Sequence, residues 1–358
     1  MTHVIDAESA HAPTAGGLQY PCGTPPSPGT AVEVAPGVLW LRMPLPLALD
    51  HINLWALADD EGWTLVDSGL NTEATAAAWE TLLGGALGGK PVRRLICTHM
   101  HPDHIGMAGW LAERTGCRLW ITRLEYLTCR TLVADTGRPA PEDGVRFYRA
   151  AGWNDEQLAR YRERFGSFGR GIYRLPDSFR RLSDGERLRI GAHEWTVVVG
   201  RGHSPEHACL YCAGLDVLIS GDQVLPRISS NVSVFPTEPD ADPLGDWLDS
   251  LDRLSAAIPD SALVLPAHNE PFRGLHARLA SLREGHTRSL DRLYAALDSP
   301  QRAVDLLGLL FRKPLRGEHY LMATGECLAH LNWLLRRGRI EATIDTNGVR
   351  WYRRTPPG

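Results

Sequence analysis

Short hydrophobic runs separated by turn residues open the chain from about residue 32. The runs cover residues 38–42, 51–57 and 63–69, and Pro, Gly and Asp lie between them. Runs of this length between turn residues predict strands, and consecutive strands with short connections tend to pair antiparallel. We therefore expect an antiparallel sheet at the start of the folded region.

Helix-like and strand-like patterns then alternate along most of the chain. Residues 72–83 and 108–113 carry helix-forming patterns, and residues 92–98 between them form a hydrophobic run. Strand patterns return at residues 187–190, 194–199, 216–220 and 262–267. Such alternation is typical of the α/β class.

Two segments depart from this alternation. Residues 124–182 are charged and aromatic, and we predict a mainly helical insertion that contributes to the wall of a substrate site. Residues 1–30 are rich in Ala, Pro, Gly, Thr and Ser, which predicts a leader that is partly disordered or draped over the protein. The length of 358 residues favours two domains, and we place the larger one at residues 31–298.

The remaining residues, 299–358, have a different character. After a long predicted helix at about 272–297, helical patterns at 303–311 and 324–337 precede two short strands joined by an Asn347-Gly348 turn. Helices followed by a β-hairpin resemble a small winged-helix domain. Residues 301–358 hold ten Lys or Arg against five Asp or Glu, a local charge of +5, so the rest must carry −9 to reach the total of −4. Nucleic acid binding is one interpretation, and packing beside the active site or in a homodimer is the other.

Bulk composition narrows the function classes. The chain is 43% hydrophobic and 22% charged, and its net charge of −4 gives no general reason to bind nucleic acid or anionic lipid. We see no export signal and no apolar run of the roughly 20 residues that a membrane span needs. Seven dispersed cysteines favour a reducing compartment, and we predict a cytoplasmic protein. Cys209 and Cys212 lie three apart on a predicted strand, so they should face opposite sides and serve packing.

Three imidazoles and a carboxylate crowd into six residues directly after the run at 92–98. They belong to the motif His-x-His-x-Asp-His at 99–104. In an extended segment His99 and His101 project to the same side, while Asp103 and His104 turn onto the next surface at a helix start. One loop can therefore serve two adjacent metal ions.

Further candidate ligands follow later strands, at His203, Asp222 and His268. Imidazoles and carboxylates suit zinc, and Mn²⁺ or Fe²⁺ as alternatives, and the absence of a cysteine cluster argues against a closed structural zinc. A workable division places three residues on each ion and Asp222 between the ions. The first set is His99, His101 and His203, and the second is Asp103, His104 and His268.

The order of these motifs, His-x-His-x-Asp-His, then Gly202-His203, Gly221-Asp222 and His268, resembles the metallo-β-lactamase superfamily over about residues 32–275. The resemblance implies a four-layer αββα sandwich and the same ligand division. It also implies that Asp67 orients a ligand histidine. Residues 273–358 complete a likeness to the lactamase-beta-like branch, which includes an endoribonuclease and bacterial hydrolases. Asp222 stands where zinc β-lactamases usually use another residue, which argues against antibiotic hydrolysis.

The leading hypothesis is a dinuclear metal hydrolase that uses a metal-bridging hydroxide to cleave an ester, thioester or lactone in a small molecule, with Asp103 passing the proton to the leaving group. The main alternative is a phosphodiesterase or endoribonuclease acting on RNA or single-stranded nucleic acid. An iron oxygenase and a binding protein with a lapsed site are further alternatives.

Three features keep two interpretations each. His207 is a donor to a ligand residue or a surface histidine, and Arg227 is a substrate contact or a salt-bridged arginine. In the insertion, arginines alternate with aromatic residues, a pattern that fits phosphate and base binding or an amphipathic helix packed on the core. These residues are Arg160, Tyr161, Arg162, Arg164, Phe165, Phe168, Arg170, Tyr173 and Arg174.

Overall fold

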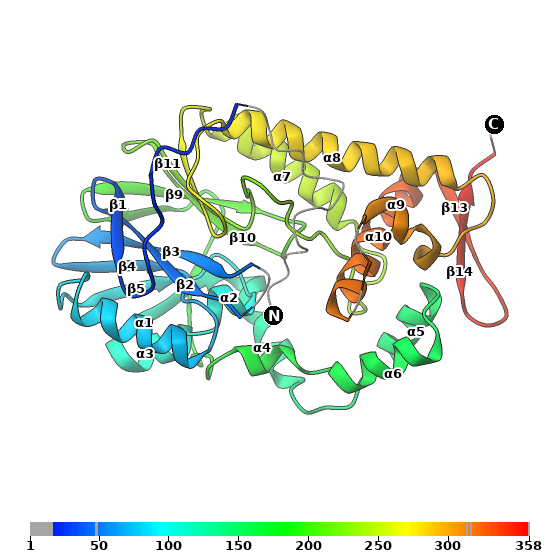
Figure 1. Cartoon of the computed structure of the whole chain (residues 1–358), viewed down its shortest axis with the longest axis horizontal. Coiled ribbons are helices and arrows are strands. Elements are labelled where there is room, and N and C mark those ends of the chain that lie inside the picture. Colours follow the sequence, from blue (N-terminus) through cyan, green and yellow to red (C-terminus); the bar gives the residue numbers. More distant parts are fainter. Residues whose placement is uncertain (1–16, 47–48, 313, 316, 357–358) are drawn as a thin grey trace.

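Two mixed β-sheets pack face to face between layers of helices (Figure 1). The computed structural model describes residues 17–46, 49–312, 314–315 and 317–356. The first sheet has the order β1-β2-β3-β4-β5-β6-β7 and the second β12-β11-β10-β9-β8. Strands of the first sheet are β1 Ala31–Ala35, β2 Val38–Pro44, β3 His51–Asp59, β4 Gly62–Val66, β5 Val92–Ile96, β6 Arg118–Thr122 and β7 Arg180–Leu182. Strands of the second are β8 Arg187–Ile190, β9 His193–Gly200, β10 His207–Cys212, β11 Val217–Gly221 and β12 Leu263–Pro266.

Pairing in the sheets follows the sequence prediction at the start and changes later. Strands β1 to β4 pair antiparallel, as expected. Strands β4, β5, β6 and β7 pair parallel, and so do β11 and β12. The ends of several strands therefore meet at the same edge of each sheet.

Adjacent residues on one strand point into different cores, which defines the four layers. Leu95 packs with the helices on the first sheet, while Ile96 packs between the sheets. In the second sheet Cys209 faces the outer helices and Cys212 faces the first sheet, which confirms that the two cysteines serve opposite faces. All seven cysteines lie within the described residues and are free thiols.

Helices cover the outer face of each sheet. The first sheet carries α1 Glu73–Gly84 and α3 Ala108–Thr115, and the second carries α7 Pro243–Ala257 and α8 Leu275–Ala296 (Figure 1). The αββα sandwich expected from the resemblance is thus confirmed. Helix α7 was not predicted, although Asp242 before Pro243 is a standard helix start: its carboxylate accepts the Gly245 N–H at 3.0 Å.

The segment 124–182 is mainly helical, with one correction. It contains α4 Arg123–Ala134, α5 Glu142–Ala150, α6 Asp155–Arg164 and the 3₁₀ helix η1 Phe168–Gly171. Its last three residues are not part of a helical insertion, because β7 extends the first sheet beside β6. The charged composition suggested that the insertion extends to residue 182. Residues 180–182 form a strand instead, because they can pair with the edge strand β6.

Helix α8 leads to the C-terminal segment, which follows the predicted order of helices and hairpin. It contains η2 Ala303–Leu306, α9 Leu307–Leu310, α10 Glu318–Arg336 and the antiparallel pair β13 Ile340–Ile344 and β14 Arg350–Arg354. The winged-helix interpretation and the domain boundaries stay predictions. The predicted leader lies partly outside the described residues, and within it Gln19 pairs with Arg273 through two backbone hydrogen bonds.

At the end of β3, a largely buried ion pair within the first sheet also receives a hydrogen bond from the second sheet. The carboxylate of Asp59 accepts hydrogen bonds from Arg94 Nη2 at 2.7 Å, Thr64 Oγ1 at 2.7 Å and the Gly191 N–H at 3.1 Å. Burial opposes ionisation, yet these donors and the charge of Arg94 hold the pKa of Asp59 below its usual value.

We predict that Asp59→Asn lowers the free energy of unfolding by about 3 kcal/mol at pH 7, because it leaves a largely buried guanidinium without its charge partner. The lowered pKa means that the stabilisation is present above the ordinary aspartate pKa of about 4 and is lost as the pH falls through the folded value. Urea unfolding at pH 7 and pH 3 should show the difference between variant and parent shrinking in acid. An equal difference at both pH values would contradict this.

Candidate metal centre

Four strands end beside one another, and a polar residue follows each of them. Asp67 and His99 follow the neighbouring parallel strands β4 and β5, while Asp222 and His268 follow the parallel pair β11 and β12. Because the two sheets pack together, these strand ends face one another across the sandwich. All four side chains are buried, with at most 2% of each residue exposed.

The loop after β5 continues into the short helix α2 Pro102–Ile105, with Pro102 at its first position. His101 is the last extended residue, with ψ of 146°, so the chain turns between His101 and Asp103. The turn gives the two halves of the motif different directions, as the sequence predicted.

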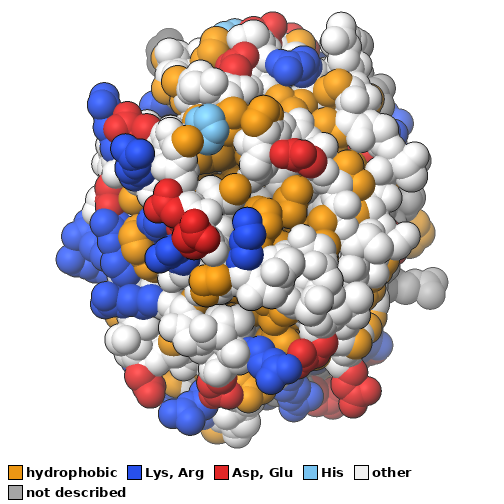
Figure 2. Space-filling model, turned by 90° about the vertical axis from the view of Figure 1, so that its left-hand side faces the viewer, with side chains coloured by type: hydrophobic (Ala, Val, Ile, Leu, Met, Phe, Trp, Pro, Cys, Tyr) orange, Lys and Arg blue, Asp and Glu red, His pale blue; other side chains and the backbone are white. Residues whose placement is uncertain are grey.

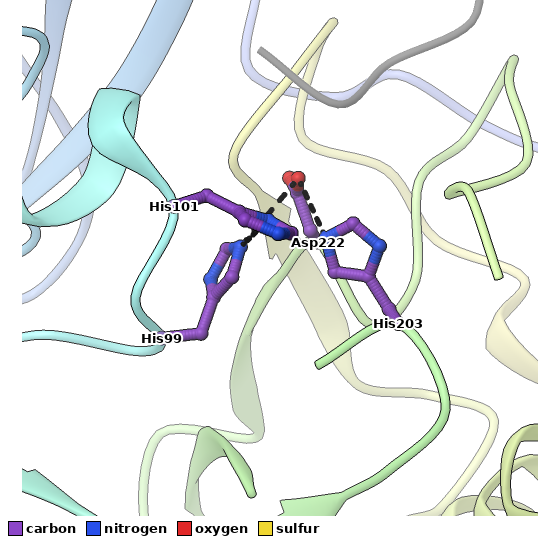
Figure 3. A group of neighbouring side chains, drawn as sticks. All are labelled: His99, His101, His203 and Asp222. Carbon is purple, nitrogen blue, oxygen red and sulfur yellow. Dashed lines mark hydrogen bonds and ion pairs between the residues drawn. The ribbon is translucent and has the colours of Figure 1, made fainter. Parts of the chain in front are cut away.

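Seven side chains gather into two adjoining groups. Figure 3 shows the first group, in which three imidazoles and a carboxylate point toward a common centre. Its members are His99, His101, His203 and Asp222. The second group consists of Asp103, His104 and His268. In each group the ligand atoms lie within 4.8 Å of one another.

Asp222 lies between the groups. Its Oδ2 is 3.4 Å from His203 Nε2, and its Oδ1 is 3.4 Å from His268 Nε2. The same Oδ2 lies 3.5 Å from His104 Nε2. One carboxylate therefore contacts imidazoles of both groups, and it is placed to bridge two cations.

The outer nitrogen of four imidazoles contacts an oxygen atom that fixes the ring. These contacts join His99 to Thr98 Oγ1 at 3.1 Å, His104 to Asp67 Oδ2 at 2.8 Å, His203 to the Asn231 carbonyl at 2.8 Å and His268 to the His51 carbonyl at 2.9 Å. For His104, His203 and His268 the partner is a carboxylate or carbonyl, which only accepts, so Nδ1 donates and Nε2 keeps a lone pair. These lone pairs face the centre.

The centre is consequently rich in acceptors and poor in donors. Buried atoms there lack a hydrogen-bond partner among the described residues, namely both carboxylate oxygens of Asp103, Oδ1 of Asp222 and the Nε2 atoms of His104, His203 and His268. Nε2 of His99 and Nδ1 of His101 lie only 2.7 Å apart, a distance that needs a proton or a cation between them. Buried polar atoms are rarely left unpaired, so the donor set fits two divalent cations.

The pKa values of the imidazoles show where positive charge is favoured. Burial among other histidines holds the pKa of His99 well below its usual value. Burial also opposes protonation of His104, but the carboxylates of Asp67, Asp103 and Asp222 raise its pKa well above the usual value. The electrostatic field therefore attracts cations toward the carboxylates.

His207 begins β10 and is fully buried, so the surface interpretation is wrong. Burial and the nearby His203 lower its pKa to about 3, and the neutral ring accepts the Asp222 N–H on Nε2 at 3.1 Å. Toward Asp222 it is therefore an acceptor, while its protonated Nδ1 lies 3.7 Å from Cys209 Sγ. The close approach to Asp222 requires glycine at 221, because φ is +50° and a Cβ there would lie 2.5 Å from His207 Nε2.

Arg227 forms a salt bridge, which is one of its two predicted roles. Its guanidinium pairs with Glu270 at 3.1 Å and lies over the Tyr20 ring at 4.9 Å. A role in binding substrate stays a prediction. In the insertion, Arg160 pairs with Glu156, while Leu158 and Tyr161 of the same helix are buried, which favours the amphipathic-helix interpretation.

Several residues that hold the centre in place were not predicted. Asn53 on β3 donates to the carbonyls of Pro266 and Asn269, on both sides of His268. A polar residue inside a hydrophobic strand run was the available signal. Glu125 joins the two loops that carry His101 and His203, and no local sequence pattern marks it.

The C-terminal segment also reaches this centre. The backbone carbonyl of Asn231 accepts a hydrogen bond from His203. The side-chain Nδ2 of Asn231 donates a hydrogen bond to the Glu326 carboxylate of α10 at 2.9 Å. The Val234 N–H donates to the Gly325 carbonyl at 3.0 Å. Helix α10 thus supports the loop that orients a candidate ligand.

The fold and the site define a class of protein: an αββα sandwich with two His/Asp groups consistent with a dinuclear metal site. Residues 47–268 match the model of the metallo-beta-lactamase superfamily, and residues 290–355 match the metallo-beta-lactamase-like C-terminal domain. The chain belongs to the metallo-beta-lactamase superfamily. Membership supports a metal-dependent hydrolase.

Solved structures with the same architecture are similar over most of the chain. A beta-lactamase domain protein from Burkholderia ambifaria is 41% identical, with a TM-score of 0.88, over 96% of this chain and 99% of that one. A metallo-beta-lactamase family protein from Thermus thermophilus is 29% identical, with a TM-score of 0.75, over 90% and 100%. A metallo-beta-lactamase from Pontibacter korlensis shares 18% identity and a TM-score of 0.50 over 71% and 98%, which shows the fold alone. Among curated proteins, none matches. Within the described residues, no helix combines the length and the apolar character that crossing a membrane requires.

Proposed function

We propose that this hydrolase cleaves an acyl bond, in an ester, thioester or lactone, of a small molecule. The supporting observation is the surface beside the metal centre. A cavity that includes Met100 and His101 in its lining is mostly apolar, and its charged lining residues are two aspartates and two arginines, which cancel. Phosphodiester backbones call for a surplus of positive charge, so this surface favours an uncharged acyl group.

The basic C-terminal segment supports the same choice, because several of its arginines are paired with acids. Arg354 lies 2.8 Å from Asp298, Arg337 lies 2.9 Å from Asp242, and Arg353 pairs with Glu341. At the opposite end of the molecule, which Figure 2 shows, acidic and apolar side chains also lie among the basic ones. These pairings leave less positive charge for a nucleic acid backbone, which remains the alternative substrate.

Zinc fits the imidazole and carboxylate donors, with Mn²⁺ or Fe²⁺ as alternatives. His99, His101, His203 and Asp222 would hold one ion, and Asp103, His104 and His268 the other. Asp222 also contacts His268 of the second group. When bound, two such cations lower the pKa of a water molecule toward neutrality and polarise the attacked carbonyl oxygen.

The protein side chains contribute two things to hydrolysis: a group that accepts a proton, and contacts that hold the ligand histidines in position. Both oxygens of Asp103 are buried without a hydrogen-bond partner among the described residues, so its carboxylate can take the proton of the attacking water and release it to the leaving group. Asp67 holds His104 through its Nδ1 and keeps the ring in one tautomer. The surrounding burial excludes bulk water, which strengthens both effects.

The test is a substrate panel with the purified full chain loaded with Zn²⁺, Mn²⁺ or Fe²⁺. The panel contains p-nitrophenyl esters, acyl thioesters, lactones and bis-p-nitrophenyl phosphate. We expect turnover of an acyl substrate that falls at least a hundredfold in His101→Ala and is retained in His193→Ala, a histidine at the start of β9 away from the centre. Turnover of the phosphodiester alone would overturn the proposal.

A further inference from the structure

The cavity beside the metal centre is large and is built from two distant parts of the chain. Its volume is about 1030 Å³. One wall comes from α4, α5 and α6, and the other from the loop at 235–239, helix α10 and the terminal hairpin. Met100 and His101 line it as well, so the cavity is continuous with the first metal-binding group.

The lining is apolar and partly aromatic. Rings from both walls contribute, namely Phe147, Tyr148, Tyr161, Phe165, Phe235 and Tyr352. Leu127 and Ile344 also line the cavity, although 49% and 68% of these residues are exposed. Exposed large apolar side chains on opposite walls indicate that the cavity opens to solvent between them, where an apolar ligand could cover them.

The few charged groups of the cavity are already engaged. Asp143 pairs with Arg146, and Asp135 lies 2.5 Å from Arg138. The Arg350 guanidinium is 3.9 Å from Asp240. The charged side chains of the walls therefore neutralise one another. A ligand in the cavity would contact mainly apolar side chains.

We propose that this cavity binds a large apolar acyl group of the substrate, with about eight carbons or more, while the scissile carbonyl lies at the metal centre. The inference rests on the proposed acyl hydrolysis and specifies its substrate class. A cavity needs only about 10 to 15 Å³ of volume to hold one water molecule, so this cavity has room for a group many times larger. An acetyl group or a small lactone would leave most of it empty.

Packing of the aromatic wall indicates that the cavity is formed in advance. The rings of Tyr148 and Tyr161 lie 4.8 Å apart, and Trp153 lies 4.4 Å from Tyr148. Tyr161 reaches α5 at Gly144, where a Cβ would lie 2.1 Å from its hydroxyl oxygen. Because the wall is already ordered, little conformational entropy is lost on binding. The apolar area that the acyl group buries should therefore contribute almost fully to its affinity.

A chain-length series tests the proposal on the metal-loaded full chain. The substrates are p-nitrophenyl esters from acetyl to dodecanoyl, with benzoyl and naphthoyl esters as an aromatic arm. Burial of each methylene contributes about 0.8 kcal/mol, so kcat/KM should rise up to about fourfold per methylene until the cavity is filled. Preference for the aromatic arm over acetyl supports the proposal equally and identifies a ring as the occupant. Flat values, or a preference for acetyl in both arms, would overturn it.

Two exposed leucines on α4 provide a matched pair of variants. Leu127 lines the cavity, whereas Leu124, which is 46% exposed, is not part of the lining. We expect Leu127→Gln to lower the ratio of kcat/KM for octanoyl over acetyl ester about fivefold, and Leu124→Gln to change it by less than twofold. Equal effects in both variants would count against the cavity as the acyl site.

Binding can be measured without turnover. The metal-free full chain is titrated with 11-(dansylamino)undecanoic acid, and decanoate is used to displace the probe. We expect saturable binding of one probe, weakened by Thr131→Trp, which fills the cavity from α4, and unchanged in Ala134→Trp on the same helix but outside the lining. Circular dichroism establishes that each variant folds.

The two measurements separate this inference from the proposed function. Probe binding without acyl turnover would contradict the proposed function and retain the apolar site. Acyl turnover without chain-length preference or probe binding would retain the proposed function and overturn the apolar site.

Discussion

Asp222→Asn should lower kcat/KM about a thousandfold and reduce the bound metal from two ions to one or none. The carboxylate lies between the two groups and contacts His203 of one and His268 of the other. Asn keeps the shape of the side chain and removes its negative charge, so the cluster loses the group that can bridge two cations. Two cooperating cations contribute several kcal/mol to hydrolysis, and about 4 kcal/mol corresponds to a thousandfold.

The same substitution at the other end of the strand provides the control. Asp216 precedes β11 with φ of +52°, a conformation that Asn also accepts, so Asp216→Asn should fold and bind metal like the parent chain. Metal content after dialysis is measured by mass spectrometry, and turnover with the best acyl substrate. Two bound ions and near-parental turnover in Asp222→Asn would show that Asp222 does not bridge.

The sequence predicted much of this centre because each candidate ligand follows a strand. A hydrophobic run predicts where a strand ends, and packed parallel strands end at a common edge. His99, Asp222 and His268 each follow a hydrophobic run of this kind, and each run forms a strand. The spacing within residues 99–104 also predicted that the motif serves two ions. His99 and His101 are extended and project to one side, whereas Asp103 and His104 lie at a helix start and project to another.

What the sequence could not predict depends on contacts between distant residues. The carboxylate of Glu326 meets Asn231 across 95 positions, and no periodic pattern relates the two. His207 illustrates the same limit, since two interpretations fitted its position until its burial was known. The cavity also combines residues from Met100 to Tyr352 of β14, and its volume follows from packing alone.

Glu125 is the clearest example of a supporting residue without a sequence signal. It lies in the first turn of α4 and is fully buried. Its carboxylate accepts the Met100 N–H at 2.9 Å, the Ser204 hydroxyl at 2.6 Å and the Glu206 N–H at 2.7 Å. Met100 lies between two candidate ligands and Ser204 follows another, so one side chain joins two loops of the metal centre.

Glu125→Ala should therefore reduce both stability and metal binding. A buried backbone N–H, a partly buried one and a buried hydroxyl lose their acceptor. At about 1 to 3 kcal/mol per unpaired group we expect a loss of about 4 kcal/mol in the free energy of unfolding. The freed loops should weaken metal affinity by about 10- to 100-fold, the usual effect of losing a group that orients ligands. Denaturant unfolding of the metal-free chain measures the first effect, and competition with a chelator measures the second.

Glu125→Gln separates the lost hydrogen bonds from the lost charge. The amide oxygen can still accept from Ser204 and Glu206, but the amide nitrogen then faces the Met100 N–H, so one of the three bonds is lost. We expect a destabilisation of about 1 kcal/mol and a smaller loss of metal affinity than in Glu125→Ala. If Glu125→Ala instead matched the parent chain in both measurements, the two loops would be held by other contacts. If Gln were as damaging as Ala, the negative charge beside His203 would be the essential property of this residue.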